Sequence, residues 1–106
     1  MDFVKKTGGN AQMQMRYSEN CVYAIQTPIG VKIGFTSRLG DRLSALQKQH
    51  GVQCYPIALL TGLTRQKALD IEKYFHEKFA PDNVEYEIFD VPPVLIVATF
   101  QCGDHP

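Results

Sequence analysis

A glutamate and a histidine four residues apart are the first side chains in this sequence that could carry out chemistry. Glu72 and His76 lie in a helical pattern, so they share one face beside its apolar stripe, at the border between core and solvent. A carboxylate there can bind a hard divalent cation through oxygen, with water and substrate phosphate completing the shell. His76 would transfer a proton or orient Glu72. An ordinary surface pair is the competing interpretation, because no second histidine completes a metal signature.

Tyr23, Lys32 and Arg42 form a second group of candidates, earlier in the chain. The guanidinium of Arg42 can make paired hydrogen bonds to phosphate oxygens, which a lysine cannot. By itself an arginine on a helix is more often a solvated surface residue. If the intervening chain folds as its pattern indicates, the three side chains meet around one end or one face of a sheet.

The elements that must position these residues begin with a hairpin. Residues 21–27 and 31–35 alternate between apolar and polar side chains, which is typical of half-buried strands, and Pro28-Ile29-Gly30 turns the chain between them. Leucines at helical spacing then predict a helix over residues 37–50. Ser37 or Asp41 would cap its start, and Gly51 would end it.

The second half of the chain continues with a strand, a helix and two further segments. Residues 54–61 predict a third strand with Pro56 at a sheet edge, and Thr64 caps a helix predicted over residues 65–79. The apolar stripe of that helix consists of Ala68, Ile71, Phe75 and Phe79.

The segments that end the chain are less clear in pattern. Residues 85–90 predict one final strand. In residues 91–100 the β-branched content favours a strand, whereas the prolines at 92 and 93 suit the entrance of a helix, which is the assignment we expect.

Taken in order, these motifs resemble the GIY-YIG nuclease superfamily. CVY at 21–23 stands where that family has GIY, KIG at 32–34 stands where it has YIG, and Arg42 follows at the family's spacing. The ExxxH pair at 72–76 and EYEIF at 85–89 resemble a compact phage and bacterial branch, in which KIG commonly replaces YIG and the strand motif is of the EWF type. The resemblance covers roughly residues 21–98.

The resemblance implies a small α/β (α+β) domain with a central, mainly antiparallel sheet of three strands flanked by helices. It implies metal-dependent hydrolysis of DNA phosphodiester bonds. Tyr23 and Lys32 would activate or position the nucleophile, with His76 as a further catalytic group. Arg42 would bind the phosphate, and Glu72 would hold a single Mg²⁺ or Mn²⁺.

Two other functions compete with a nuclease. Lys32 replaces the tyrosine of YIG, and a lysine is ordinarily protonated near neutral pH and a poor base. One alternative is therefore a catalytically silent GIY-YIG-like module that binds nucleic acid or a protein partner. The other is an oligomeric structural protein, such as a homodimer, in which the apolar residues 94–97 pack against a second copy.

Length and charge are consistent with one domain that has two different halves. The 106 residues predict a domain over 21–100, an N-terminal tail over 1–20 with a short ordered piece near 13–17, and a C-terminal tail over 101–106. The net charge is zero, but residues 1–51 carry seven basic and three acidic side chains, and the remainder carries four basic and eight acidic. The basic half is where a polyanion such as DNA would lie.

Cysteine usage and hydropathy point to an intracellular protein. Cys21, Cys54 and Cys102 form no CxxC motif, so we expect buried reduced thiols rather than a disulfide or zinc site. No apolar run reaches the roughly 18–20 residues of a membrane span, and no apolar leader is present at the N-terminus. We therefore expect a soluble, cytoplasmic chain without membrane contact.

Overall fold

The computed structural model describes residues 20–103 and 105–106. The predicted tail over 1–20, including the ordered piece near 13–17, lies outside the described residues apart from Asn20. The elements in chain order are β1 (Asn20–Thr27), β2 (Gly30–Thr36), α2 (Leu39–His50), β3 (Tyr55–Leu63), α3 (Arg65–Lys78), the 3₁₀ turn η1 (Ala80–Asp82), β4 (Asn83–Glu85), β5 (Ile88–Phe89) and α4 (Pro93–Gln101).

The sheet has five strands in the order β3-β1-β2-β5-β4, and every neighbouring pair is antiparallel. The α/β class is confirmed, whereas the expected number of three strands is too small. The two additional strands, β4 and β5, come from residues 83–89, where a single final strand over 85–90 was predicted outside the central three. A turn at Tyr86 and Glu87 divides the segment, and the Asn83 side chain secures the turn by donating to the carbonyl oxygens of Tyr86 at 2.7 Å and Ile88 at 3.1 Å.

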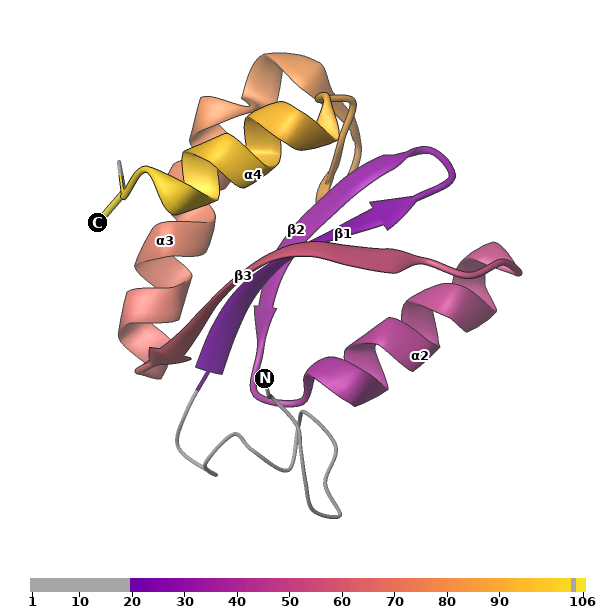
Figure 1. The fold of residues 1–106 in the computed structure, drawn as a ribbon, viewed down its shortest axis with the longest axis horizontal. Coiled ribbons are helices and arrows are strands. Elements are labelled where there is room, and N and C mark those ends of the chain that lie inside the picture. The colour runs from indigo at the N-terminus through magenta and orange to yellow at the C-terminus, as the bar shows by residue number, and fades with distance from the viewer. Residues whose placement is uncertain (1–19, 104) are drawn as a thin grey trace.

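The β1–β2 hairpin sets which side chains share a face of the sheet. Tyr23 is paired with Gly34, and Ile25 with Lys32, so all four lie on one face because directly opposed residues point the same way. The alternate residues of both strands point to the other face. Figure 1 shows α2 against one face of the sheet and α3 with α4 against the other.

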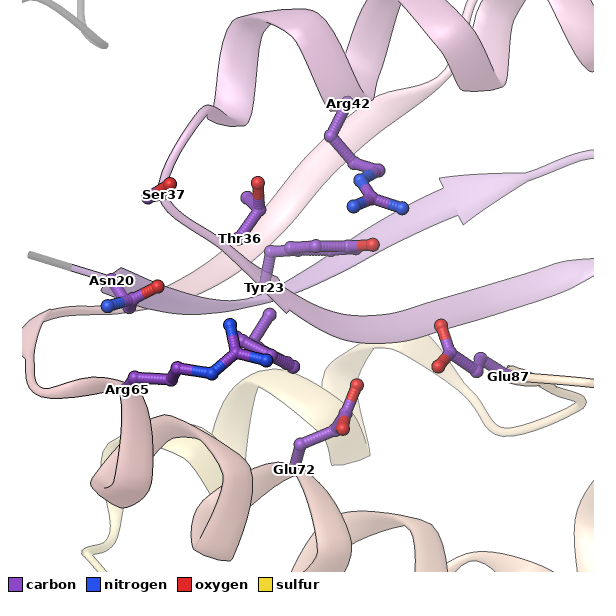
Figure 2. Close-up of a pocket in the computed structure, with 9 residues that line it drawn as sticks. Asn20, Tyr23, Thr36, Ser37, Arg42, Arg65, Glu72 and Glu87 are labelled. Carbon is purple, nitrogen blue, oxygen red and sulfur yellow. The ribbon is translucent and has the colours of Figure 1, made fainter.

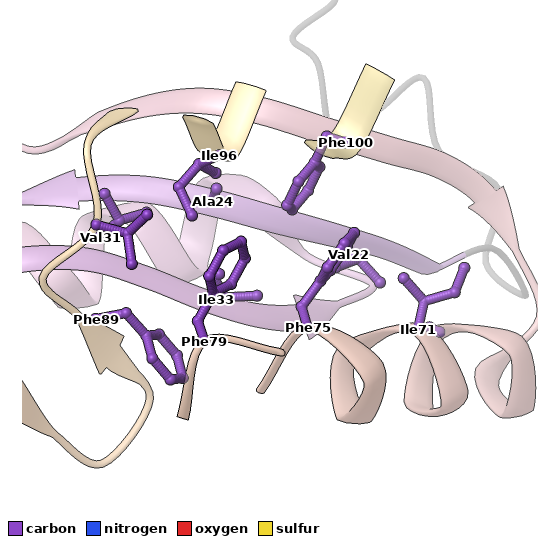
Figure 3. Close-up of a cluster of buried hydrophobic side chains, with 12 residues drawn as sticks. Val22, Ala24, Val31, Ile33, Ile71, Phe75, Phe79, Phe89, Ile96 and Phe100 are labelled. Atoms are coloured by element: carbon purple, nitrogen blue, oxygen red, sulfur yellow. The ribbon is translucent and has the colours of Figure 1, made fainter. Parts of the chain in front are cut away.

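Each face supports a separate apolar core. On the α3 and α4 face, Phe75 lies at the centre, with its ring stacked 4.5 Å from that of Phe100 (Figure 3). Sequence reasoning named the whole stripe of α3 that contributes here, and all four residues are buried. On the α2 face a smaller cluster consists of Cys21, Tyr23, Ile25, Leu39, Leu46 and Cys54.

The helix boundaries largely follow the sequence signals. Thr64 caps α3, its Oγ1 accepting a hydrogen bond from the Lys67 N–H at 3.1 Å, and Gly51 ends α2 in the left-handed conformation with φ 72°. The predicted caps of α2 are wrong, because Arg38 takes the cap position without a side-chain bond. Instead, the Thr36 hydroxyl accepts a bond from the Arg38 N–H at 2.9 Å.

The C-terminal segment forms a helix, as expected for residues 91–100. Within α4, Ile96 is fully buried in the main core, while Val94 is 77 % exposed and Leu95 is 48 % exposed. The apolar run at 94–97 therefore does not form one continuous outer surface, because its third member belongs to the chain's own core. Beyond the helix, the centroid of the His105 ring lies 5.7 Å from that of the Phe75 ring, and the two rings are packed edge to face.

Two of the three cysteines behave as predicted. Cys21 and Cys54 are buried and unpaired, whereas Cys102 is exposed, which contradicts the prediction for that residue. Burial raises the pKa of the Cys21 thiol to about 11, so Cys21 is uncharged at neutral pH. Among the described helices, none is both long and apolar enough to cross a bilayer.

Candidate active site

A cavity of about 280 Å³ lies at the edge of β2, between α2 and α3 (Figure 2). This volume lies just below the roughly 300–1,000 Å³ of pockets that hold drug-sized ligands. Most of the lining side chains are polar or charged. They are Asn20, Tyr23, Phe35, Thr36, Ser37, Arg42, Arg65, Glu72 and Glu87.

The cavity exists because β5 covers only the first part of β2. The two strands pair at Val31 and Lys32, and a last backbone bond runs from the Ile33 N–H to the Glu87 carbonyl at 3.0 Å. Within the described residues, no strand pairs with this edge of β2 beyond Ile33. Side chains from both faces of the sheet therefore reach the same space around an open edge. Figure 2 shows Tyr23 and Arg42 on one side of the strands and Arg65 and Glu72 on the other.

Gly34 makes room for the phenol of Tyr23. A Cβ at Gly34 would lie 2.6 Å from the Tyr23 hydroxyl and 3.3 Å from Oε1 of Glu87. Real Cβ atoms do not approach an oxygen as closely as 2.6 Å, so only glycine allows the phenol to lie across β2 in this way. The same two distances place the hydroxyl and the Glu87 carboxylate close to one point above Gly34 at the cavity.

Tyr23 is a protonated phenol at neutral pH. Its side chain is 1 % exposed, and this burial raises its pKa well above the ordinary value. Arg42 opposes the rise, while the negative charges of Glu87 and Glu72 add to it. The hydroxyl is consequently available at neutral pH to donate a hydrogen bond to an oxygen in the cavity.

Two carboxylates and one imidazole form a cluster with the spacing of a cation site. Ligand atoms of Glu72, His76 and Glu87 all lie within 4.8 Å of one another, and all three residues are half-buried. Burial raises the pKa of Glu72, as does the charge of Glu87, whereas His76, Lys32 and Arg42 lower it. Two carboxylates drawn together out of water repel each other, and a divalent cation between them removes that cost. The oxygen-rich donor set fits Mg²⁺ or Mn²⁺.

A backbone contact fixes the ring of His76. Its Nε2 lies 2.7 Å from the carbonyl oxygen of Ile33, and a carbonyl can only accept, so Nε2 carries the hydrogen. The ring also packs 5.3 Å from that of Phe89. In the neutral imidazole, Nδ1 is then the nitrogen with the free lone pair.

Lys32 is tied to the cluster through Glu87. Its Nζ lies 2.9 Å from Oε1 of that carboxylate, and the lysine side chain is only 15 % exposed. Of the five residues predicted from the sequence, Tyr23, Arg42 and Glu72 line the cavity. Lys32 and His76 stand beside it: Lys32 is paired with Glu87 of the wall, and a ring nitrogen of His76 lies within 4.8 Å of carboxylate oxygens of Glu72 and Glu87.

Two charged lining residues were missed by sequence reasoning. Glu87 belongs to the EYEIF motif at 85–89, but the spacing within that motif gives no reason to select Glu87 over Glu85 as a site residue. Arg65 is the first residue of α3 and precedes Glu72 by seven residues, which is close to two helical turns and places both on one helix face. This spacing from Glu72 is the sequence pattern that could have identified Arg65 as a site residue. Arg42 and Arg65 form no ion pair with any residue that the structure describes.

Comparison with known proteins gives one match. The family model described as the T5orf172 domain matches residues 16–102, which is most of the chain. The matched region includes every residue of the cavity wall. No curated protein and no solved structure matches the chain.

Proposed function

The chain belongs to the T5orf172 domain family, and from this membership and the geometry of the cavity we propose that it is a metal-dependent endonuclease that hydrolyses DNA phosphodiester bonds. The family is phage-associated and related to nuclease-like folds, which supports a role on nucleic acid. We further propose that the endonuclease is of the GIY-YIG type, which its sequence motifs resemble.

The observation that carries the proposal is the convergence of Tyr23, Arg42 and Glu72 on one small cavity. They come from β1, α2 and α3, and they meet at the open edge of β2. Hydrolysis of a phosphodiester needs a positioned nucleophile, neutralisation of charge at phosphorus and stabilisation of the leaving oxygen. A phenol, a guanidinium without an ion-pair partner among the described residues, and a carboxylate cluster are suited to these tasks in turn.

Arg42 would hold the scissile phosphate. Its guanidinium lies next to the Tyr23 phenol, where its charge acts on the pKa of that group, and it forms no ion pair with any described residue. It can therefore give both arms of its donor fork to phosphate oxygens. The protonated Tyr23 hydroxyl would donate to the attacking water or to a phosphate oxygen, which orients the reacting groups.

Glu72 and Glu87 would hold the divalent cation, since Mg²⁺ and Mn²⁺ prefer oxygen ligands. When bound, the cation would supply Lewis-acid stabilisation of the phosphate and of the leaving oxygen. His76 is the side chain in the cluster suited to proton transfer, through Nδ1, because its Nε2 is tied to Ile33. Lys32 keeps the Glu87 carboxylate in place and is assigned a positioning role.

The proposal is tested by nicking of supercoiled plasmid, with branched and single-stranded DNA as further substrates, in Mg²⁺ or Mn²⁺. Wild type is compared with Glu72→Ala and Arg42→Ala, and with Glu77→Ala as a matched control on the exposed side of α3. We expect metal-dependent nicking by wild type and Glu77→Ala, and a loss of about 100-fold or more in the other two.

The same assay identifies the alternatives. Equal nicking by wild type and Glu72→Ala would refute the assigned site. No nicking by any form, together with salt-dependent DNA binding that Arg42→Ala weakens, would instead establish a catalytically silent binding module. A stable dimer insensitive to both changes, with neither nicking nor DNA binding, would favour the structural alternative.

A further inference from the structure

Arg65 is a cation that faces the cavity from the side opposite Arg42. It lines the same space, but it belongs to α3 and approaches β2 from the other face of the sheet (Figure 2). Two other described cations of this region have carboxylate partners: Lys32 is paired with Glu87 at 2.9 Å, and Arg38 with Asp41 at 2.8 Å. Arg65, like Arg42, has no carboxylate partner among the described residues.

An aromatic ring holds the Arg65 guanidinium in place. Its Cζ lies 5.4 Å from the ring centroid of Phe35, which also lines the cavity. A guanidinium stacked on a ring keeps its donor edge free for hydrogen bonds in the plane of the group. Phe35 thus fixes the position of the charge without neutralising it.

The place of Arg65 on its helix is electrostatically unfavourable. It is the first residue of α3, whose first turn contains no acidic residue. The positive end of the helix dipole repels a cation, so an arginine is unfavourable there unless it binds something anionic.

We propose that Arg65 binds a second phosphate of the substrate strand, next to the phosphate held by Arg42. The strand then crosses the open edge of β2 from the α2 side to the α3 side, beside the carboxylate cluster. The ligand class is a continuous nucleic-acid backbone rather than a single phosphate or a mononucleotide. The inference rests on the proposed function for the role of the site, but it concerns binding and not cleavage.

The test measures binding of a short fluorescent single-stranded DNA, and of its duplex, without divalent metal over a range of salt concentrations. Wild type is compared with Arg65→Ala, Arg65→Lys and Phe35→Leu. Lys67→Ala is the matched control, because Lys67 is an exposed cation two residues along the same helix and lies outside the cavity wall. Melting temperatures are recorded for each variant.

We expect Arg65→Ala to weaken binding about 5- to 10-fold and to reduce the slope of log K against log salt by about 1, the amount for one phosphate contact. Arg65→Lys should keep the salt slope but lose part of the affinity for DNA. Phe35→Leu should do the same, because the charge of Arg65 remains but the ring that positions it is removed. Lys67→Ala should match wild type. Arg65→Ala should melt no lower than wild type, because it removes a cation from the positive end of α3.

The outcomes separate this inference from the proposed nuclease. Nicking by wild type with an unchanged salt slope in Arg65→Ala would overturn the inference and leave the nuclease intact. If Arg65→Ala reduces the salt slope by one phosphate contact but wild type does not nick DNA, the result would support the inference and refute the nuclease. Absence of any DNA binding by wild type, or an equal effect of Lys67→Ala, would also overturn the inference.

Discussion

Tyr23 and Gly34 are cross-strand partners whose side chains depend on each other. The phenol lies where a Cβ at position 34 would have to be, so the glycine permits the tyrosine to reach the cavity. Glycine is needed here for close approach, and the backbone at position 34 is not in the left-handed region. The KIG motif is thus explained by the ring that packs over it.

Replacing Gly34 with alanine should displace the phenol. We expect a loss of stability of about 1–3 kcal/mol, the usual cost of overpacking, together with loss of any nicking activity. Chemical denaturation measures the stability. The change should be less costly in a Tyr23→Phe background, where the nearest clashing atom is gone, and equal costs in both backgrounds would contradict the packing argument.

The raised pKa of Glu72 predicts how stability depends on pH. Between the ordinary pKa of 4.5 and the raised value, the folded protein binds more protons than the unfolded chain. The free energy of unfolding should therefore fall as pH rises through that window and stay lower above it. Glu72→Gln removes this penalty, so it should be at least as stable as wild type at neutral pH.

Thermal melting from pH 4 to 8 without divalent metal tests this prediction. Glu77→Gln, at an exposed position of α3, should keep the wild-type profile. Adding Mg²⁺ or Mn²⁺ should raise the melting temperature of wild type and not that of Glu72→Gln, because a cation that binds only the folded site stabilises it. A Glu72→Gln profile that matches wild type would show that this carboxyl does not cause the pH dependence.

At the scale of elements, the β4–β5 hairpin completes the site. Its turn brings Glu87 to the open edge of β2, and the bond from the Ile33 N–H to the Glu87 carbonyl fixes it there. The turn contains Tyr86, which is 89 % exposed and has φ +47°. A bulky residue in the left-handed region is strained, and this strain lowers the free energy of unfolding. No contact described for the Tyr86 ring compensates for it.

Tyr86→Gly should relieve this strain and raise stability by about 1 kcal/mol. The measurement is the midpoint of denaturant unfolding. Tyr86→Ala is the control: it removes the ring but keeps a Cβ, so the strain and the wild-type stability should remain. A gain of the same size in both variants would assign the effect to the exposed ring instead of the backbone.

At the scale of the whole molecule, one sheet separates two cores and carries the site at an open edge between them. The larger core depends on α4, which packs Ile96 and Phe100 against the α3 face. The site residues of α3 are positioned by that same packing, since Phe75 lies between Glu72 and His76 along the helix. Anchoring of the C-terminal helix and the geometry of the carboxylate cluster are therefore linked.

Phe100→Ala should cost about 3–5 kcal/mol, a large part of the roughly 5–15 kcal/mol that stabilises a typical domain. Denaturant unfolding gives the value directly. Val94 lies on the same helix but is 77 % exposed, so Val94→Ala should change stability by no more than about 0.5 kcal/mol. A small effect of Phe100→Ala would mean that α4 is not required for the larger core.

Local chemistry in the sequence was enough to predict most of the elements, and the resemblance to a known family added three of the cavity residues. The hairpin, the Thr64 cap and the stripe of α3 follow from alternation, capping and helical period, which involve residues close in the chain. The motif order likewise singled out Tyr23, Arg42 and Glu72, all of which line the cavity.

What only the tertiary structure decided depends on contacts between distant residues. Glu87 reaches the cluster because an edge strand turns at Tyr86, and Lys32 is held beside the cavity by an ion pair across 55 residues of sequence. The open edge of β2, where side chains from both faces meet, is a property of which strands pair and where pairing stops. No local period encodes that stopping point, because it is set by the packing of the whole sheet.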